Sequence, residues 1–245
     1  GTVDEDIAKT QEVIEATEKL KRGLMQQLFT RGIGHTKFKE TKIGAIPEEW
    51  EVVKIGDICD VFTGGTPSTS KEEYWDGDIP WMSSGEVNNK VIKEVEKCIT
   101  ADGFKNSNAR MLPVGTVMLA LAGQGKTRGM VAILEMETTC NQSLAGIVSK
   151  NPNDTYSKYI FYNLEFRYQE LRNINGSEGR AGLNLRIIKD FLVPLPSVKE
   201  QKEIAEILSA IDEKILVNKK LKAKLTLLKK GLMQDLLSGS VRVTT

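Results

Sequence analysis

The most suggestive chemistry in the chain lies in residues 118–130, which read MLALAGQGKTRGM. The spacing AxxxxGKT at residues 120–127 is that of a loop that binds nucleotide phosphates, with alanine in place of the first glycine. Such a loop works because its glycine turn opens directly into a helix, whose first amides face the phosphates. Here Gly129 and an apolar run ending at Leu134 follow, which predicts a returning strand. We interpret the segment as a hairpin tip and keep nucleotide binding as the least favoured alternative.

The polar side chains on this tip suit the base edges and phosphates of a nucleic acid. Arginine and lysine donate to guanine, glutamine pairs with adenine, and glycine lets the backbone approach closely. Residues 63–71, 81–90 and 175–184 are further glycine-containing loops with hydroxyl, amide or cationic side chains. For each loop, a solvated turn is the alternative to a DNA contact. The candidate DNA-contacting residues are Gln124, Lys126, Thr127, Arg128, Thr66, Ser68, Lys71, Arg180 and Asn184.

Residues suited to catalysis and metal binding are scarce. The one histidine, His35, lies in a glycine-flanked segment and is expected to be a solvated side chain. Serine and cysteine triads need an imidazole base, and the usual zinc sites need several histidine or cysteine ligands. Cys59, Cys98 and Cys140 are scattered along the chain, which is typical of free thiols in the reducing cytoplasm. We therefore assign no catalytic residue, no metal site and no cofactor to this chain.

The charge and hydropathy of the chain limit the kinds of partner that it can bind. The 245 residues carry a net charge of +1, and 27% of them are charged, which is ordinary for a soluble globular protein. No apolar run approaches the ~20 residues that cross a bilayer, and the acidic start does not resemble a secretion signal. Residues 46–198 carry 16 Lys and Arg against 20 Asp and Glu. Because neutralised phosphates supply most of the affinity for DNA, this balance predicts weak DNA binding by the chain alone.

The two ends of the chain repeat each other. Residues 3–32 align without a gap to residues 211–240, and both copies contain the sequence GLMQ. A gapless match of this length indicates the same structural role performed twice.

Both copies have the pattern of long helices packed along a seam. Apolar residues recur at three- and four-residue steps, with either Leu20 or Lys21 on the first stripe. Thr10 and Asn218 occupy equivalent polar positions and are expected to fix the register. Two surface helices on one globular core are the alternative. The predicted helix-pair interface consists of Ile7, Ile14, Leu24, Leu28, Ile211, Ile215, Leu225, Leu232 and Leu236.

The middle of the chain changes character to short β-branched runs, glycine-rich turns and one helical stretch. Ser197 is a candidate N-cap for the second long helix, with Glu200 completing a capping box. We predict an α+β fold: a mixed α/β globular domain with short strands, plus long terminal helices packing as an antiparallel, coiled-coil-like pair. The predicted order is a long helix at 1–32, a linker at 33–45, the globular domain at 46–198, a long helix at 199–240 and a tail at 241–245.

Four stretches carry a resemblance to a known family. They are GAIPEEWEVVKIGDICDVFTGGTPSTSKEEYWDGDIPW, LPVGTVMLALAGQGKTRGMVAI, NQSLAGIV and RAGLNLRIIKDFLVPLPSVKEQKEIAEILSAIDEKI. Together they make the chain similar to the specificity subunits of type I DNA restriction–modification systems. The most specific feature is the last stretch, in which Pro-x-Pro precedes Glu-Gln and a long helix. The resemblance identifies residues 46–198 with a target recognition domain of that family.

The resemblance implies a role without catalysis of its own. Such subunits read a split DNA sequence through two target recognition domains, which a pair of long helices holds apart. The helices also dock methyltransferase subunits, which use S-adenosylmethionine to methylate adenine, and a restriction and motor subunit joins the complex. S-adenosylmethionine and ATP are accordingly expected on the partner subunits only, and the expected location is the cytoplasm.

The chain departs from the family pattern because it contains one recognition domain where a full subunit contains two. Two interpretations stay open: a fragment of a longer subunit, which the start inside helical sequence favours, or a half-size form that pairs with a second copy of itself. The main rival function is a coiled-coil adaptor that binds protein and never contacts DNA. Side-chain identity alone does not predict which bases are read, because loop geometry and DNA shape also contribute.

Overall fold

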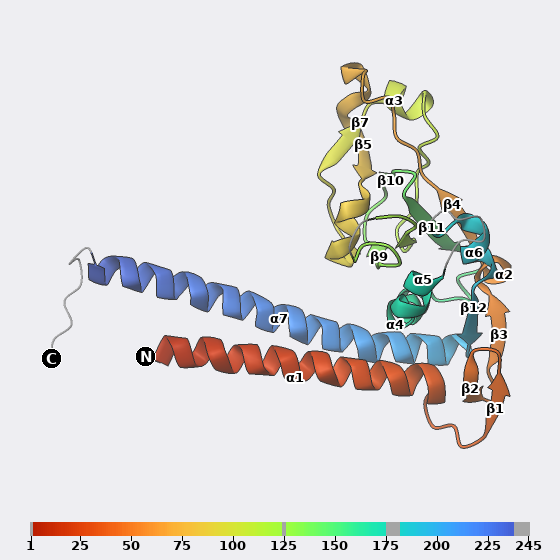
Figure 1. The fold of residues 1–245 in the computed structure, drawn as a ribbon, viewed down its shortest axis with the longest axis horizontal. Coiled ribbons are helices and arrows are strands. Elements are labelled where there is room, and N and C mark those ends of the chain that lie inside the picture. The colour runs from red at the N-terminus through yellow and green to blue at the C-terminus, as the bar shows by residue number, and fades with distance from the viewer. Residues whose placement is uncertain (1, 124–125, 175–181, 238–245) are drawn as a thin grey trace. The chain divides into compact units, whose positions relative to one another are not determined.

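The computed structural model describes residues 2–123, 126–174 and 182–237 and has the predicted α+β fold (Figure 1). The chain divides into two units, one of residues 1–27 with 206–245 and one of residues 28–205, which we call the helix pair and the head. In the described part of the chain, no helix is both long and apolar enough to span a membrane.

The helices and 3-10 turns are α1 (Thr2–Arg31), α2 (Ile55–Ile58), η1 (Glu72–Tyr74), η2 (Ser84–Asn89), α3 (Ala101–Lys105), α4 (Ser157–Phe166), α5 (Tyr168–Asn173), α6 (Leu185–Asp190) and α7 (Val198–Leu237). The strands are β1 (Phe38–Thr41), β2 (Gly44–Pro47), β3 (Glu51–Lys54), β4 (Cys59–Thr63), β5 (Trp75–Met82), β6 (Val91–Ile92), β7 (Lys97–Ile99), β8 (Val117–Ala120), β9 (Val131–Leu134), β10 (Thr139–Cys140), β11 (Leu144–Ser149) and β12 (Leu192–Leu195). Residues 33–45, predicted as a linker, include β1 and the start of its antiparallel partner β2.

Within the helix pair, α1 and α7 lie side by side and run antiparallel (Figure 1). Polar contacts cross the seam along its length. The residue numbers of the partners increase along α7 as they decrease along α1, as expected for an antiparallel pair. Ion pairs and hydrogen bonds of this kind fix the register of two helices. In order, the contacts are Lys21–Asp212, Glu18–Lys219, Gln11–Lys222 and Asp4–Lys229.

The structure distinguishes among the predicted interface residues. It buries Lys21 and exposes Leu20, with 6% and 55% of their surfaces accessible, so the lysine lies on the stripe. Leu232 is 45% exposed and lies past Lys229, the furthest α7 residue with a described ion pair to α1. The side chain of Leu236 lies outside the described residues. Of the remaining predicted residues, Ile14, Leu28 and Ile215 are buried, and Ile7, Leu24, Ile211 and Leu225 are partly buried.

The prediction that Thr10 and Asn218 fix the register is wrong. The Thr10 hydroxyl donates to the carbonyl of Asp6 at 2.7 Å, and the Asn218 amide donates to the carbonyl of Lys214 at 2.8 Å. Both bonds stay within one helix, because a short polar side chain reaches the carbonyl four residues back more easily than the facing helix. The ion pairs across the seam specify the register instead.

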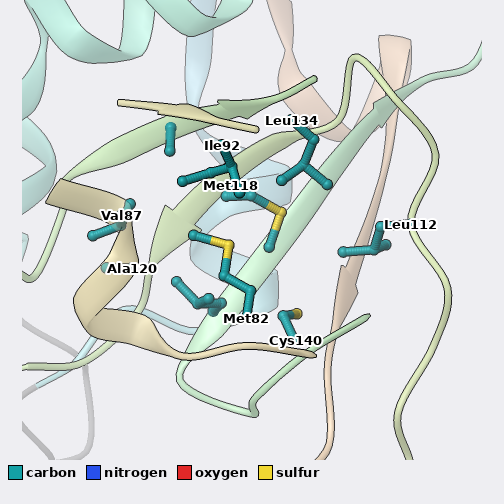
Figure 2. Close-up of a cluster of buried hydrophobic side chains, with 10 residues drawn as sticks. Met82, Val87, Ile92, Leu112, Met118, Ala120, Leu134 and Cys140 are labelled. Carbon is teal, nitrogen blue, oxygen red and sulfur yellow. The ribbon is translucent and has the colours of Figure 1, made fainter. Parts of the chain in front are cut away.

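The head is built on a five-stranded sheet with the order β4-β11-β8-β9-β6. Neighbouring strands are antiparallel except β6, which pairs parallel to β9. Strands β8 and β9 are buried along their whole length, as their unbroken apolar sequences predict. A buried cluster packs together side chains of the sheet and the segments that cover it (Figure 2). Its members are Met82, Val87, Ile92, Leu112, Met118, Ala120, Ala132, Leu134, Cys140 and Leu144.

The antiparallel pairing of β8 with β9 confirms the hairpin predicted for residues 118–130. Lys126 and Thr127 are followed by a turn and then by β9. Gly129 occupies the left-handed region with φ of 84°, which lets the chain reverse at low steric cost. Since a strand follows where a phosphate-binding loop requires a helix, the amides that would hold phosphates are not arranged for that purpose.

The start of α7 agrees with half of the predicted cap. The Ser197 hydroxyl accepts the backbone N–H of Glu200 at 3.3 Å, as expected for an N-cap. The carboxylate of Glu200 does not complete the predicted capping box; it accepts the indole N–H of Trp50 and the amide of Ile33. Donors from distant parts of the chain thus take the place of the N-cap backbone N–H group that a capping box would use.

Candidate nucleic-acid interface

Two of the four loops predicted to contact DNA lie at one end of the five-stranded sheet. Loop A (residues 64–71) follows β4, loop B (residues 121–130) joins β8 to β9, and a turn at residues 141–143 precedes β11. Antiparallel pairing brings the ends of β4 and β8 and the starts of β9 and β11 to the same edge. Loop C (residues 174–184) connects α5 to α6.

The root of loop A is held by close backbone contacts. A Cβ atom on Gly64 would lie 1.9 Å from the carbonyl oxygen of Cys140, so only glycine fits. Gly65 donates its N–H to the same carbonyl at 2.9 Å, and its own carbonyl accepts the indole N–H of Trp81 at 2.9 Å. The sheet therefore presents the rest of the loop from a rigid base.

The tip of loop A carries the three residues predicted to contact DNA. Thr66 is half-buried and donates its hydroxyl to the side-chain carbonyl of Gln142, whereas Ser68 and Lys71 are exposed. The Lys71 ammonium donates to the hydroxyl of Tyr74 at 3.0 Å. This hydrogen bond raises the pKa of Lys71 above its ordinary value, which lies well above neutral pH already, so the side chain is cationic.

The two cationic side chains of loop B, Lys126 and Arg128, have different surroundings. Lys126 is exposed, and its backbone carbonyl accepts the hydroxyl of Tyr168 at 2.6 Å, so the backbone is anchored while the side chain faces solvent. Arg128 is half-buried, and its guanidinium donates to the backbone carbonyl of Arg172 in α5. Thr127 between them is half-buried.

The described exit of loop C lies against loop B. Leu183 donates its N–H to the carbonyl of Leu121 at 3.0 Å. The side chain of Asn184 accepts the N–H of Ile187 at 3.0 Å, so this predicted contact residue caps α6 and remains exposed. Two other predicted contact residues, Gln124 and Arg180, lie outside the described residues.

The turn at residues 141–143 joins loop A to loop B. Besides the contact of Gln142 with Thr66, Ser143 accepts the N–H of Leu121 with its carbonyl at 2.9 Å. Gln142 is exposed. Gln142 was not among the residues predicted to contact DNA, because its turn contains no glycine and the place of the turn beside the other loops depends on strand pairing.

Arg110 is a second residue that sequence reasoning missed. Its guanidinium carbon lies 3.9 Å from the centre of the Phe62 ring, and the side chain is exposed. The backbone just before it packs against loop A, since a Cβ on Gly65 would lie 2.5 Å from the carbonyl carbon of Asn108. Arg110 therefore adds a cation beside the loop cluster.

The fourth predicted loop, residues 81–90, contains a side chain with a structural role. Glu86 is buried, and its carboxylate accepts the backbone N–H groups of Ser83 and Glu96 at 2.6 and 2.9 Å. The bond from Ser83 belongs to a capping box at the start of η2, and the bond from Glu96 ties the following segment to the same carboxylate.

The loop cluster, which consists of loops A and B and the turn at residues 141–143, carries hydrogen-bonding groups and positive charge. Burial raises the pKa of the Cys59 and Cys140 thiols to about 12, so both are neutral at physiological pH. Among the residues that the structure describes, no group of three or more His, Cys, Asp or Glu side chains is placed to hold a metal ion.

The expectation that His35 is a solvated side chain is wrong. Its side chain is 13% exposed, and its Nε2 atom lies 3.0 Å from a carboxylate oxygen of Glu200. Its ring also meets the ring of Trp50 edge to face, at a centroid distance of 6.1 Å. The flanking glycines suggested a loose segment, whereas tertiary packing fixes it.

A hollow of about 560 Å³ lies beside α5 and α6. Several of its charged residues are already paired: Arg167 pairs with Glu170, and Asp190 is approached by Arg186 and by Lys54, which lies outside the lining. Mutual pairing leaves the hollow without a clear preference for an anionic or cationic ligand. Its lining is Lys42, Ile43, Arg167, Glu170, Ile174, Asn184, Arg186, Ile187, Asp190, Phe191 and Leu192.

Residues 47–227 match the family described as the type I restriction modification DNA specificity domain. The chain is 37% identical over 190 residues to the type I restriction enzyme MjaIX specificity subunit of Methanocaldococcus jannaschii, covering 76% of this chain and 43% of that protein. It is 25% identical to the EcoR124I/EcoR124II specificity subunit of Escherichia coli, covering 71% of this chain and 42% of that protein.

Solved structures share the fold. The HsdS subunit from Thermoanaerobacter tengcongensis superposes with a TM-score of 0.64 at 16% identity, over 96% of this chain and 54% of that one. The type I restriction–modification S subunit from M. genitalium gives a TM-score of 0.65 at 16% identity, over 100% of this chain and 59% of that one. The chain thus spans about half the length of the relatives that it matches.

Proposed function

The chain belongs to the type I restriction–modification DNA specificity family, and from this membership we propose that its head reads one half of a bipartite DNA target. The helix pair then serves as the spacer and docking element of the complex. The proposal assigns DNA recognition to this chain and leaves methylation and cleavage to partner subunits.

The observation that carries the proposal is the convergence of loops A and B and the turn at residues 141–143. Hydrogen bonds from Thr66 to Gln142 and from Leu121 to Ser143 tie the three segments into one surface. That surface displays hydroxyl, amide and ammonium groups on a rigid sheet edge. Side chains of these types read base edges and phosphates, and a rigid support fixes which base each one meets.

The geometry suggests how the roles divide. Gln142 and Thr66 present an amide and a hydroxyl, which suit base edges in the major groove. Lys126, Lys71 and Arg110 carry exposed positive charge, which suits phosphates. Arg128 is expected to contribute mainly by holding loop B to α5 through its bond to Arg172.

The helix pair is proposed to dock the methyltransferase subunits. Large apolar side chains on α1 and α7 are exposed, which is unusual for a surface in permanent contact with water. S-adenosylmethionine and ATP are proposed to bind the methyltransferase and motor subunits, and this chain is proposed to bind neither. The exposed residues include Val13, Leu20, Leu216, Val217, Leu221 and Leu227.

The test is the methylation pattern of a host that carries the complete operon. Sequencing of methylated bases with the native chain gives the target motif. Replacing Gln142 with alanine should relax the motif at one position within one half-site, because a lost base contact costs about 1–3 kcal/mol at that position alone. If a second, different recognition domain reads the other half-site, that half-site should remain unchanged and serves as an internal control; if a second copy of this chain reads it, both half-sites should relax at the equivalent position.

A coiled-coil adaptor without DNA contact predicts a different result. Substitutions in loop A, loop B and the turn would then leave the methylated motif and the affinity of the assembled complex for DNA unaltered. Combined substitution of Thr66, Lys126 and Gln142 by alanine, with no change in either measurement, would exclude the proposed function.

A further inference from the structure

Two side chains of α5 hold the part of loop B that carries Lys126, and all of these residues belong to the head. The hydroxyl of Tyr168 donates to the backbone carbonyl of Lys126 at 2.6 Å. The guanidinium of Arg172 donates to the oxygen of the same hydroxyl at 2.9 Å. A cationic donor polarises the hydroxyl, which strengthens its own hydrogen bond to loop B. We call Tyr168 and Arg172 the brace.

The helix that carries the brace is itself fixed in the head. Leu171, next to Arg172, is fully buried. The backbone of loop B also approaches α5 closely, since a Cβ atom on Gly129 would lie 3.3 Å from the backbone nitrogen of Arg172. The guanidinium of Arg128 donates to the carbonyl of Arg172. Loop B is therefore attached to α5 at two places, one at Lys126 and one at residues 128–129.

Loop B needs this support because its local sequence does not fix its backbone. Gly123 and Gly129 have φ of 146° and 84°, and glycine adopts many backbone conformations with little difference in energy. The ammonium of Lys126 lies at the end of a flexible four-carbon chain, so its position depends on where the backbone is held. The hydroxyl of Tyr168 supplies that constraint directly at the Lys126 peptide group.

We propose that Tyr168 is a positioning residue that holds the Lys126 ammonium at one phosphate of the DNA, without a DNA contact of its own. The inference rests on the proposed function, which assigns Lys126 to a phosphate. Phosphate contacts of this kind fix the register of a protein on the duplex. Without the hydroxyl, the ammonium is spread over several positions and meets the phosphate for only part of the time. The net charge stays the same, so any loss of phosphate binding reports position alone.

The experiment combines Tyr168→Phe with Lys126→Ala in the chain assembled with its methyltransferase subunits. Dissociation constants for the target duplex are measured at several salt concentrations for the native complex, both single variants and the double variant. Tyr168→Phe keeps the ring and removes the donor, and it should weaken binding about threefold to fivefold. It should also reduce the slope of log K against log salt by between about 0.5 and 1, although no charge has been removed.

The double variant measures whether the hydroxyl acts through the lysine. It should bind the target no more weakly than Lys126→Ala alone, because residues that act as one unit give losses that do not add. Tyr156→Phe is the matched control. Tyr156 directly precedes α4, and its hydroxyl has no hydrogen-bond partner among the residues that the structure describes. This control should keep the native affinity and the native salt slope.

A merely structural role for the hydroxyl predicts that the losses from Tyr168→Phe and Lys126→Ala multiply in the double variant, with a native salt slope for Tyr168→Phe. Either of these results would overturn the proposal, and so would native affinity in Tyr168→Phe. Failure of the proposed function has a different signature, since the native complex itself would then bind the target and a scrambled duplex equally.

Discussion

Lys126 and Arg128 stand two residues apart on loop B but have different surroundings. Lys126 is exposed above an anchored backbone, whereas the guanidinium of Arg128 is engaged with the carbonyl of Arg172. An exposed cationic side chain can neutralise a phosphate without first breaking a bond within the protein. The difference in surroundings therefore predicts a difference in role between two residues that sequence reasoning treated alike.

Replacing Lys126 with alanine should weaken binding of the assembled complex to target and non-target duplexes by a similar factor. It should also reduce the slope of log K against log salt by about 1, because one fewer counterion is released. Fluorescence titrations at several salt concentrations measure both quantities. Lys199→Ala, at a lysine with 86% side-chain exposure on α7, is the control and should keep the native slope. A native slope for Lys126→Ala would remove this residue from the interface.

The buried thiols predict alkaline destabilisation. Burial raises the pKa of Cys59 and Cys140 from 9.0 to about 12, so the folded chain keeps these protons where the unfolded chain loses them. The stabilisation is fully present below pH 9 and is lost as the pH rises through about 12. Urea unfolding at pH 8 and pH 10.5 should show a fall in the free energy of unfolding.

Variants identify the source of that fall. A Cys59→Ala, Cys140→Ala double variant should have a flatter dependence on pH than the native chain, because it lacks both buried thiols. Equal slopes for the double variant and the native chain would show that other groups cause the alkaline loss.

At the scale of the elements, the helix pair combines an apolar stripe with ion pairs of unequal burial. Lys21 and Asp212 have side-chain exposures of 8% and 31%, whereas Lys219 and Glu18 have 54% and 38%. Partial burial reduces screening by water, so the first pair discriminates more strongly between registers. Its position nearer the head end of the seam also means that a slip along the helices would separate two partly desolvated charges.

A double-mutant cycle on Lys21 and Asp212 should give a coupling energy of about 1 kcal/mol or more in urea unfolding. The same cycle on Lys219 and Glu18 should give less than about 0.5 kcal/mol, because exposed pairs gain little. Raising the salt concentration to 1 M should reduce the second coupling more than the first. Equal couplings for the two pairs would contradict the assignment of register to Lys21 and Asp212.

At the scale of the whole molecule, charge and recognition chemistry point in different directions. The head displays groups that suit DNA, yet residues 46–198 carry more acidic than basic residues. Under the proposed function, long-range attraction to the phosphates then comes largely from other subunits of the complex. The proposed function thus assigns selectivity to this chain and expects the affinity to be supplied jointly.

We therefore expect the isolated chain to bind a labelled target duplex weakly and to lose the binding as salt is raised. Addition of the methyltransferase subunits should restore tight, sequence-specific binding. Parallel titrations with and without those subunits make the comparison, with a scrambled duplex as the control. Equal affinity for the target in both titrations would refute the expected division of labour.

The sequence alone determined those features that depend on local pattern. The repeat of residues 3–32 at residues 211–240 predicted two long antiparallel helices, since apolar periodicity reflects which face of a helix is buried. The glycine after Thr127 and Arg128, followed by an apolar run, predicted the hairpin of β8 and β9, because a turn and a strand are fixed by neighbouring residues.

The tertiary structure alone decided which residues from distant segments meet. Gln142 lies beside loops A and B because β11 pairs with both β4 and β8. The local sequence does not predict this pairing. His35 and Glu200 are 165 residues apart, and their hydrogen bond forms because burial away from water makes each polar group require a partner. The sequence supplied the chemistry of these side chains, and long-range packing chose their partners.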